Sequence, residues 1–162
     1  MKPVRLKMEA FGPYAKTTTL DFEALHGKPL VLIHGPTGGG KTAILDAMCY
    51  GLFGKTSGDE RQGDDLRSDL ADPGHLTRIT FDFLHGDRLL RVVREPKQAK
   101  KKSRGEGFTE HKTRAWLWDQ TQSSSSDNPN DEGHLLAEKP TAVDAEVRAI
   151  LGFTEEQFRQ IV

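Results

Sequence analysis

The first segments of the chain alternate between apolar and polar positions. Val4–Glu9 follows this alternation closely, and Thr17–Phe22 combines threonines with apolar residues. A period of two is typical of a β-strand that buries one face. Because the turn-forming sequence Phe11–Tyr14 lies between the two segments, the pattern predicts a hairpin of two strands.

A continuous apolar run and a helical pattern follow. Leu30–Ile33 contains no polar residue, which predicts a strand buried on both faces. Thr42–Phe53 has apolar residues at helical spacing, and Gly54 is a suitable end for that helix. A glycine-rich turn joins the two segments, so the pattern predicts a strand, a turn and a helix within an α/β fold.

The second half of the chain is predicted to form strands and then two helices. Leu76–Leu84, Arg88–Arg94 and Thr113–Asp119 are strand-like, and the first two are joined by a short turn. The segment from Pro140 to Gly152 has one apolar face at helical spacing. Thr154–Gln157 has the spacing of a capping box, which predicts the start of a final helix.

Three polar segments separate these elements. Residues 58–74 are irregular and rich in charged side chains. Residues 97–107 form a basic segment that contains glycine, and residues 121–133 are rich in serine, aspartate, asparagine and proline. We expect 97–107 and 121–133 to be mobile loops.

Composition limits the class of protein. The chain has 162 residues, of which 35% are hydrophobic and 29% charged, which suits one domain with a modest core. No run approaches the ~18 apolar residues of a membrane helix, and the first residues lack the pattern of a signal peptide. One cysteine excludes an internal disulfide. We therefore expect a cytoplasmic protein with no membrane partner. The last residues contain no helix stop signal, so we expect the chain to be a piece of a longer protein.

The glycine-rich turn matches the phosphate-loop pattern G-x-x-x-x-G-K-[ST]. Glycines allow consecutive backbone N–H groups to point at phosphate oxygens, and a lysine adds a positive charge that reaches the β- and γ-phosphates. The threonine hydroxyl is a suitable ligand for Mg²⁺, and the start of the following helix attracts the same anion. The predicted cofactors are ATP and Mg²⁺, and the predicted nucleotide-binding residues are Gly35, Pro36, Thr37, Gly38, Gly39, Gly40, Lys41, Thr42 and Ala43.

Two other interpretations of this turn remain. A glycine-rich strand-to-helix turn that binds nothing has the same composition. A dinucleotide-binding turn is less favoured, because Lys41 and Thr42 would have no role there.

Several segments together resemble one protein family. Gly35–Gly54 is similar to the phosphate loop and following helix of the SbcC ATPases, relatives of the SMC proteins that act in DNA double-strand-break repair. The resemblance spans essentially the whole chain through further segments: Ala10–Tyr14, Leu66–Ala71, Arg104–Gly107, Leu151–Phe153 and Gln157–Val162.

The resemblance implies a fold and roles for individual residues. Residues 1–162 would form the N-terminal lobe of an ABC-type ATPase head, with a mixed sheet around the phosphate-loop helix and an antiparallel strand group from residues 76–119. Lys41 would contact phosphate and act in catalysis, and Thr42 would bind magnesium. Arg67 matches a position where related heads use an arginine near the phosphates. Its alternative role is a surface salt bridge to a nearby aspartate.

The resemblance also implies partners and an activity. These are an SbcD-type nuclease subunit, a second copy of the head and double-stranded DNA, in the bacterial cytoplasm at the nucleoid. The activity would be ATP hydrolysis, with the nuclease chemistry in the partner. The Q-loop, coiled coil, signature motif and Walker B acids of such proteins are absent from these residues, so we expect the chain alone to bind nucleotide weakly and to hydrolyse little or none.

Two surface features have open interpretations. Lys97, Lys100, Lys101, Lys102 and Arg104 form a basic cluster that is suited either to DNA phosphates or to a solvated loop. Trp116 and Trp118 lie two residues apart on one face of a predicted strand. Packing in a core or an interface is favoured for them over stacking on a base.

Three competing functions remain open. The first is another SMC-like head, such as a RecF-type recombination ATPase. The second is a small-molecule kinase with a phosphate loop, and the third is a nucleotide-binding structural module that never turns over.

Overall fold

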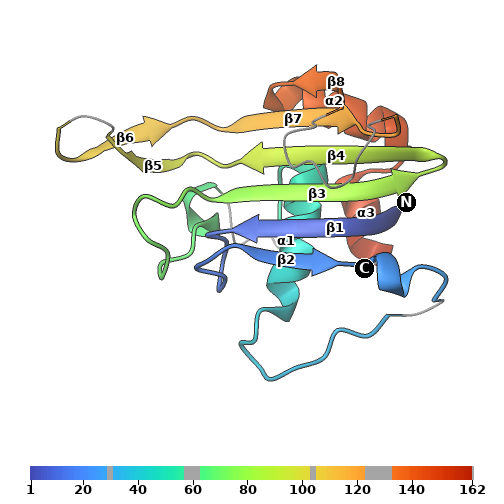
Figure 1. The fold of residues 1–162 in the computed structure, drawn as a ribbon, viewed down its shortest axis with the longest axis horizontal. Helices are drawn as coiled ribbons and strands as arrows, with labels where there is room; N and C mark the ends of the chain where they lie inside the picture. The colour runs from blue at the N-terminus through green and yellow to red at the C-terminus, as the bar shows by residue number, and fades with distance from the viewer. Residues whose placement is uncertain (29–30, 57–62, 103–104, 123–132, 162) are drawn as a thin grey trace.

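The computed structural model describes residues 1–28, 31–56, 63–102, 105–122 and 133–161. Its main feature is a six-stranded sheet with the order β2-β1-β3-β4-β7-β8, in which every neighbouring pair is antiparallel (Figure 1). The strands are β1 (Lys2–Glu9), β2 (Thr18–Asp21), β3 (Arg78–His85), β4 (Arg88–Glu95), β7 (Arg114–Asp119) and β8 (His134–Glu138). The predicted hairpin of β1 and β2 and the predicted strands in β3, β4 and β7 are confirmed. Strand β8 was not predicted.

A second, two-stranded sheet is formed by β5 (Gln98–Lys101) and β6 (Phe108–His111). It continues the directions of β4 and β7 and projects beyond the six-stranded sheet (Figure 1). The expectation of a mobile loop at 97–107 is therefore wrong for the residues that the structure describes, because they pair as an antiparallel hairpin. Of the second expected loop, residues 123–132 lie outside the described part of the chain.

Three α-helices cover one face of the main sheet (Figure 1). They are α1 (Lys41–Phe53), α2 (Pro140–Leu151) and α3 (Glu155–Ile161), and two 3-10 turns are η1 (Glu23–Leu25) and η2 (Gly63–Leu66). The predicted ends of α1 and α2 at Gly54 and Gly152 are confirmed. The predicted capping box is also present, since the Thr154 N–H donates to Gln157 Oε1 at 2.8 Å and the Gln157 N–H to Thr154 Oγ1 at 3.4 Å.

The core lies between the helices and the sheet. Alternate strand residues point at the helices and are buried, as the period of two requires. Helix α1 lies close to the sheet because Gly51 has no side chain: a Cβ there would meet Phe81 Cβ at 3.3 Å. The core side chains include Leu6, Met8, Ala47, Leu52, Ile79, Phe81, Val92, Leu117, Val143 and Val147.

A buried arginine ties α1 to α2. Arg94 on β4 is 1% exposed. Its Nε donates to the Gly51 carbonyl at 2.8 Å, and its Nη2 donates to the Leu52 carbonyl at 3.0 Å and to Asp144 Oδ1 at 2.6 Å. The last carbonyls of a helix receive no hydrogen bond from within it, so a cation at this end supplies donors and complements the helix dipole.

The predicted buried strand at 30–33 is wrong for the described residues. Val31, Leu32 and Ile33 belong to no strand and are 47%, 81% and 39% exposed. A strand buried on both faces needs neighbouring backbones to satisfy its N–H and C=O groups, and no strand among the described residues lies beside this segment. The expected mixed sheet is wrong for the same part of the chain, because it required a parallel pair.

Candidate nucleotide-binding site

The glycine-rich segment is an exposed loop that leads into α1. Its residues from Gly35 to Gly39 are exposed, and the Gly39 N–H donates to the Pro36 carbonyl at 3.1 Å, which closes a turn. Gly40 precedes the helix with a φ of +84°, a left-handed conformation that favours glycine. The loop is thus open to a ligand, and its glycines allow the curl that the motif requires.

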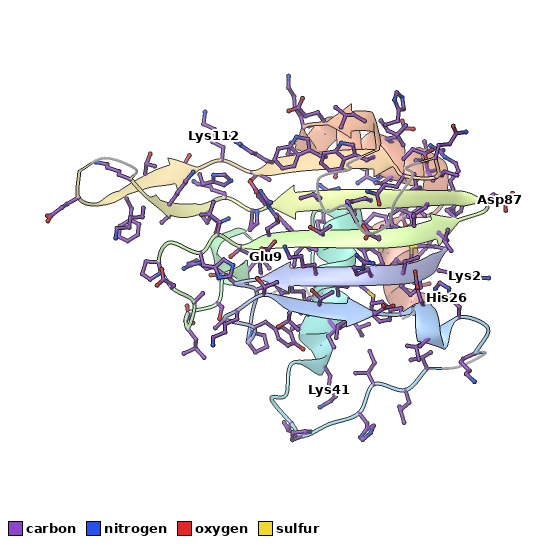
Figure 2. The ribbon with its side chains drawn as sticks, viewed as in Figure 1. Lys2, Glu9, His26, Lys41, Asp87 and Lys112 are labelled. Atoms are coloured by element: carbon purple, nitrogen blue, oxygen red, sulfur yellow. The ribbon has the colours of Figure 1, made fainter. Side chains whose placement is uncertain are left out.

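Lys41 places its ammonium group over this loop. Its Nζ donates to the carbonyls of Gly35 at 2.9 Å and Pro36 at 2.8 Å. Figure 2 shows Lys41 at the first turn of α1, beside the extended loop. A positive charge therefore lies at the positive end of a helix dipole, and only carbonyl oxygens of the loop offset it. This arrangement is suited to an anion.

The first turn of α1 supplies further groups. The first helical hydrogen bond is donated by the Ile44 N–H to the Gly40 carbonyl at 3.3 Å, so the N–H groups before it have no acceptor inside the helix. The Thr42 side chain is exposed, whereas Ala43 is 5% exposed and packs into the core. Thr42 can therefore offer its hydroxyl to a bound cation, while Ala43 can offer only its backbone.

Tyr14 also contacts the end of the loop. Its hydroxyl donates to the Gly40 carbonyl at 3.2 Å. The sequence interpretation placed this tyrosine only in a turn between β1 and β2. The proximity to Gly40 depends on a separation of 26 residues along the chain, which no local pattern reveals.

Arg67 does not adopt either of its expected roles in the described residues. Its Nη1 donates to the His75 carbonyl at 2.6 Å, and its Nη2 donates to the carbonyls of Asp72 at 2.8 Å and Ala71 at 3.4 Å. Among the side chains that the structure describes, no aspartate forms an ion pair with it. The guanidinium instead holds the turn that follows it.

The basic cluster lies on the β5–β6 hairpin. Lys100, Lys101 and Lys102 are exposed, and Lys97 forms an exposed ion pair with Glu110 at 2.9 Å. Arg104 lies outside the described residues. The hairpin thus presents three lysines that project from the body of the domain (Figure 1).

A buried polar cluster anchors this hairpin to the main sheet. Glu95 is buried and accepts hydrogen bonds from Arg78 Nε at 2.7 Å and from His111 Nε2, which lies 2.7 Å from it. Burial raises the pKa of Glu95, but the hydrogen bonds and charges of Arg78 and His111 outweigh it and hold the pKa below its ordinary value. Gln98 adds two bonds to the backbone of Thr77, at 2.7 Å to its N–H and 2.9 Å to its carbonyl. The orientation of the hairpin is therefore set by its base.

The two tryptophans pack against each other. Trp116 and Trp118 have ring centroids 6.2 Å apart and an interplanar angle of 19°. They point away from the core face of β7, where Ala115 and Leu117 are buried. Packing on the sheet surface accounts for both side chains.

Two other kinds of site are absent from the part of the chain that the structure describes. Within it, no group of three or more histidine, cysteine, aspartate or glutamate side chains is arranged to hold a metal ion. None of the described helices combines the length and the hydrophobicity that crossing a membrane requires.

The exposed glycine loop, the lysine above it and the helix behind it define a domain of the phosphate-loop class. The chain belongs to the AAA domain family, whose model matches residues 5–159. That match covers the loop, α1, the main sheet and the hairpin in one unit.

Similar proteins carry one name, that of the SbcC component of the nuclease SbcCD. The chain is 40% identical over 162 residues to this protein of Vibrio cholerae, with 100% of this chain and 15% of the relative covered. It is 38% identical over 164 residues to the protein of that name from Lactococcus lactis, with the same coverages. A Staphylococcus aureus protein of that name is 45% identical over 95 residues, which is 59% of this chain and 9% of the relative. The resemblance to the SbcC family is confirmed, and the chain spans about 15% of the length of the first two relatives.

Proposed function

We propose that this chain is the ATP-binding segment of an SbcC-type ATPase that acts with a nuclease partner in DNA repair. The observation that carries the proposal is the Lys41 ammonium, held over an exposed glycine loop at the start of α1. In this position it exchanges two loop carbonyls for phosphate oxygens at little cost, because it is already at the loop surface. The names of the relatives support the SbcC-type assignment over a RecF-type one.

The residues of the loop fit a triphosphate with its magnesium ion. Lys41 would neutralise phosphate charge, the N–H groups of the first turn of α1 would donate to phosphate oxygens, and the exposed Thr42 hydroxyl would bind the metal. When bound, magnesium supplies further neutralisation of charge on the phosphates. Orientation of the phosphate chain is the part that this segment performs by itself.

The architecture supports one lobe of an ABC-type head as the larger unit. Val31, Leu32 and Ile33 are exposed apolar residues directly before the loop, and strands from another part of the protein would cover them. ATP would then lie between two such heads, each of which completes the site of the other. We therefore propose that this segment alone binds nucleotide weakly and hydrolyses little or none.

The proposed cycle involves an SbcD-type nuclease subunit and DNA. ATP binding would bring two heads together, and hydrolysis would release them and control access of DNA to the nuclease. We place the complex in the bacterial cytoplasm at the nucleoid. Arg67 would act near the phosphates only after its guanidinium leaves the carbonyls of residues 71–75, so we propose this role for the engaged state of the heads.

Hydrolysis by the full-length protein tests the proposal. We expect ATP turnover with the nuclease partner present and a higher rate when linear duplex DNA is added. A protein that binds ATP but releases no phosphate under either condition would be a nucleotide-binding module, and the ATPase assignment would be wrong.

We further propose that the β5–β6 hairpin contacts DNA phosphates. Lys100, Lys101 and Lys102 are exposed on a projecting element whose base is fixed by buried hydrogen bonds, so three charges reach outward from a defined position. Lysine contacts of this kind bind phosphate without reading sequence.

Neutralising these three lysines should flatten the salt dependence of DNA binding. For the variant with Lys100, Lys101 and Lys102 changed to glutamine, we expect the slope of log K against log salt to fall by about 1 for each lysine that contacts a phosphate. The matched control changes the exposed Lys2, Lys16 and Lys28 to glutamine, which removes the same charge from positions away from the hairpin. If both variants have the same slope, only net charge matters, and the hairpin is not a DNA contact.

A further inference from the structure

Tyr14 lies against the last glycine of the phosphate loop. Its hydroxyl donates to the Gly40 carbonyl at 3.2 Å. A Cβ added to Gly40 would lie 2.8 Å from Tyr14 Oη and 3.0 Å from Pro13 Cγ, so the turn packs directly on the backbone of the loop. This glycine is therefore needed both for its left-handed conformation and for the approach of the tyrosine.

The hydrogen bond constrains the peptide that begins α1. The carbonyl of Gly40 and the N–H of Lys41 belong to the same planar, trans peptide unit, in which the two groups point in opposite directions. A donor that holds the carbonyl therefore also fixes the direction of the N–H. This N–H is among the first of the helix and has no acceptor inside it. Among the donors of α1, it is the one that the tyrosine orients directly.

The turn that carries Tyr14 is itself rigidly held. The Phe11 N–H donates to the Tyr14 carbonyl at 3.0 Å and the Tyr14 N–H to the Phe11 carbonyl at 2.9 Å. The Gly12 N–H donates to the Leu66 carbonyl at 3.0 Å, and the Phe11 side chain is buried in the core. The phenol is thus placed by backbone bonds rather than by a flexible side chain alone.

A second set of bonds fixes the start of the same turn. The carbonyl of Ala10 accepts from the Ser68 N–H at 2.9 Å and from Thr77 Oγ1 at 2.8 Å. Burial raises the pKa of Tyr14, so its hydroxyl remains a donor at neutral pH. The support is therefore in place before any ligand binds.

We propose that Tyr14 is a positioning residue of the phosphate loop, whose hydroxyl fixes the Gly40–Lys41 peptide so that the Lys41 N–H is oriented to donate to a phosphate oxygen. This inference rests on the proposed function, since it assumes that the loop binds ATP. The tyrosine touches the loop and not the phosphates. Its effect is therefore on the phosphate chain, whatever base the nucleotide carries.

Tyr14→Phe tests this role, because it keeps the ring and removes only the hydroxyl. In the full-length protein with magnesium, we expect about 5-fold weaker binding of both ATP and inorganic tripolyphosphate, measured by displacement of a fluorescent ATP analogue. The thermal midpoint should change little, because the ring still packs on Gly40. The matched control is Tyr50→Phe, which removes a hydroxyl from the buried part of α1 and should leave both affinities unchanged.

The outcomes separate this inference from the proposed function. Weaker binding of ATP with unchanged binding of tripolyphosphate would assign Tyr14 to the base and overturn the positioning role. Unchanged affinity for both ligands would also overturn it, while loss of binding in Lys41→Ala would leave the proposed function standing. Unchanged ATP binding in Lys41→Ala would instead overturn the proposed function itself.

Discussion

Lys41→Ala should lower the affinity of the full-length protein for ATP by at least about 100-fold. The ammonium lies 2.9 Å and 2.8 Å from two loop carbonyls, so a triphosphate bound to the loop would meet this charge first. A hydrogen bond to a charged group contributes up to about 3 kcal/mol, which corresponds to about 100-fold in affinity. A nucleotide titration with magnesium, followed by calorimetry or by fluorescence, measures the change.

Lys55→Ala is the control for this substitution. Lys55 follows the other end of α1, is exposed, and forms an ion pair with Glu155 at 3.2 Å. The two variants remove the same charge from opposite ends of one helix. Wild-type affinity in the Lys41 variant, or an equal loss in both, would show that the loop is not the phosphate site.

Arg94→Met should destabilise the packing of α1 by about 3 kcal/mol. The substitution leaves the carbonyls of Gly51 and Leu52 without their donors in a buried place, and it leaves Asp144 without its cation. Unsatisfied buried polar groups and broken buried ion pairs carry costs of this size. Amide hydrogen exchange of α1 in the full-length protein measures the loss as a lower free energy of local opening.

The control for Arg94 is another arginine of the same strand. Arg88 pairs with Asp119 at 2.9 Å, but its side chain is 42% exposed, so Arg88→Met should cost no more than about 1 kcal/mol. Equal protection of α1 in both variants would mean that burial does not strengthen the Arg94 contact. It would also remove the account of how α1 is held at the end away from the loop.

Local patterns were sufficient for most elements of the chain. Alternation identified β1, β3, β4 and β7, and helical spacing with a terminal glycine identified α1 and α2. Each of these signals lies within a few residues of the element that it describes, and each reports which face is buried. For the same reason, the capping box at the start of α3 could be identified from four consecutive residues.

The basic segment shows where composition was misleading. Its charge and glycines favoured a mobile loop, but residues 98–101 and 108–111 pair as strands. The decisive contacts come from outside the segment, because Glu95 holds His111 and Thr77 holds Gln98. A pattern confined to the lysines contains no information about these partners.

The apolar run before the loop was misleading in the opposite direction. Its hydrophobicity predicted burial, but burial of a strand also requires neighbours for its backbone. Among the described residues no strand lies beside Val31–His34, and the apolar side chains are exposed. Hydrophobicity states a preference, and the rest of the fold decides whether it is met.

The sequence by itself determined the phosphate-loop motif, its lysine and threonine, and the helix behind them, because these features depend on adjacent residues and on their backbone preferences. Only the tertiary structure decided that Tyr14 supports Gly40, that Arg67 binds the carbonyls of its own turn, and that Arg94 joins α1 to α2. These contacts link residues brought together by the folding of the chain around the sheet. Their energies depend on burial and on distance, and neither quantity is encoded in a local pattern.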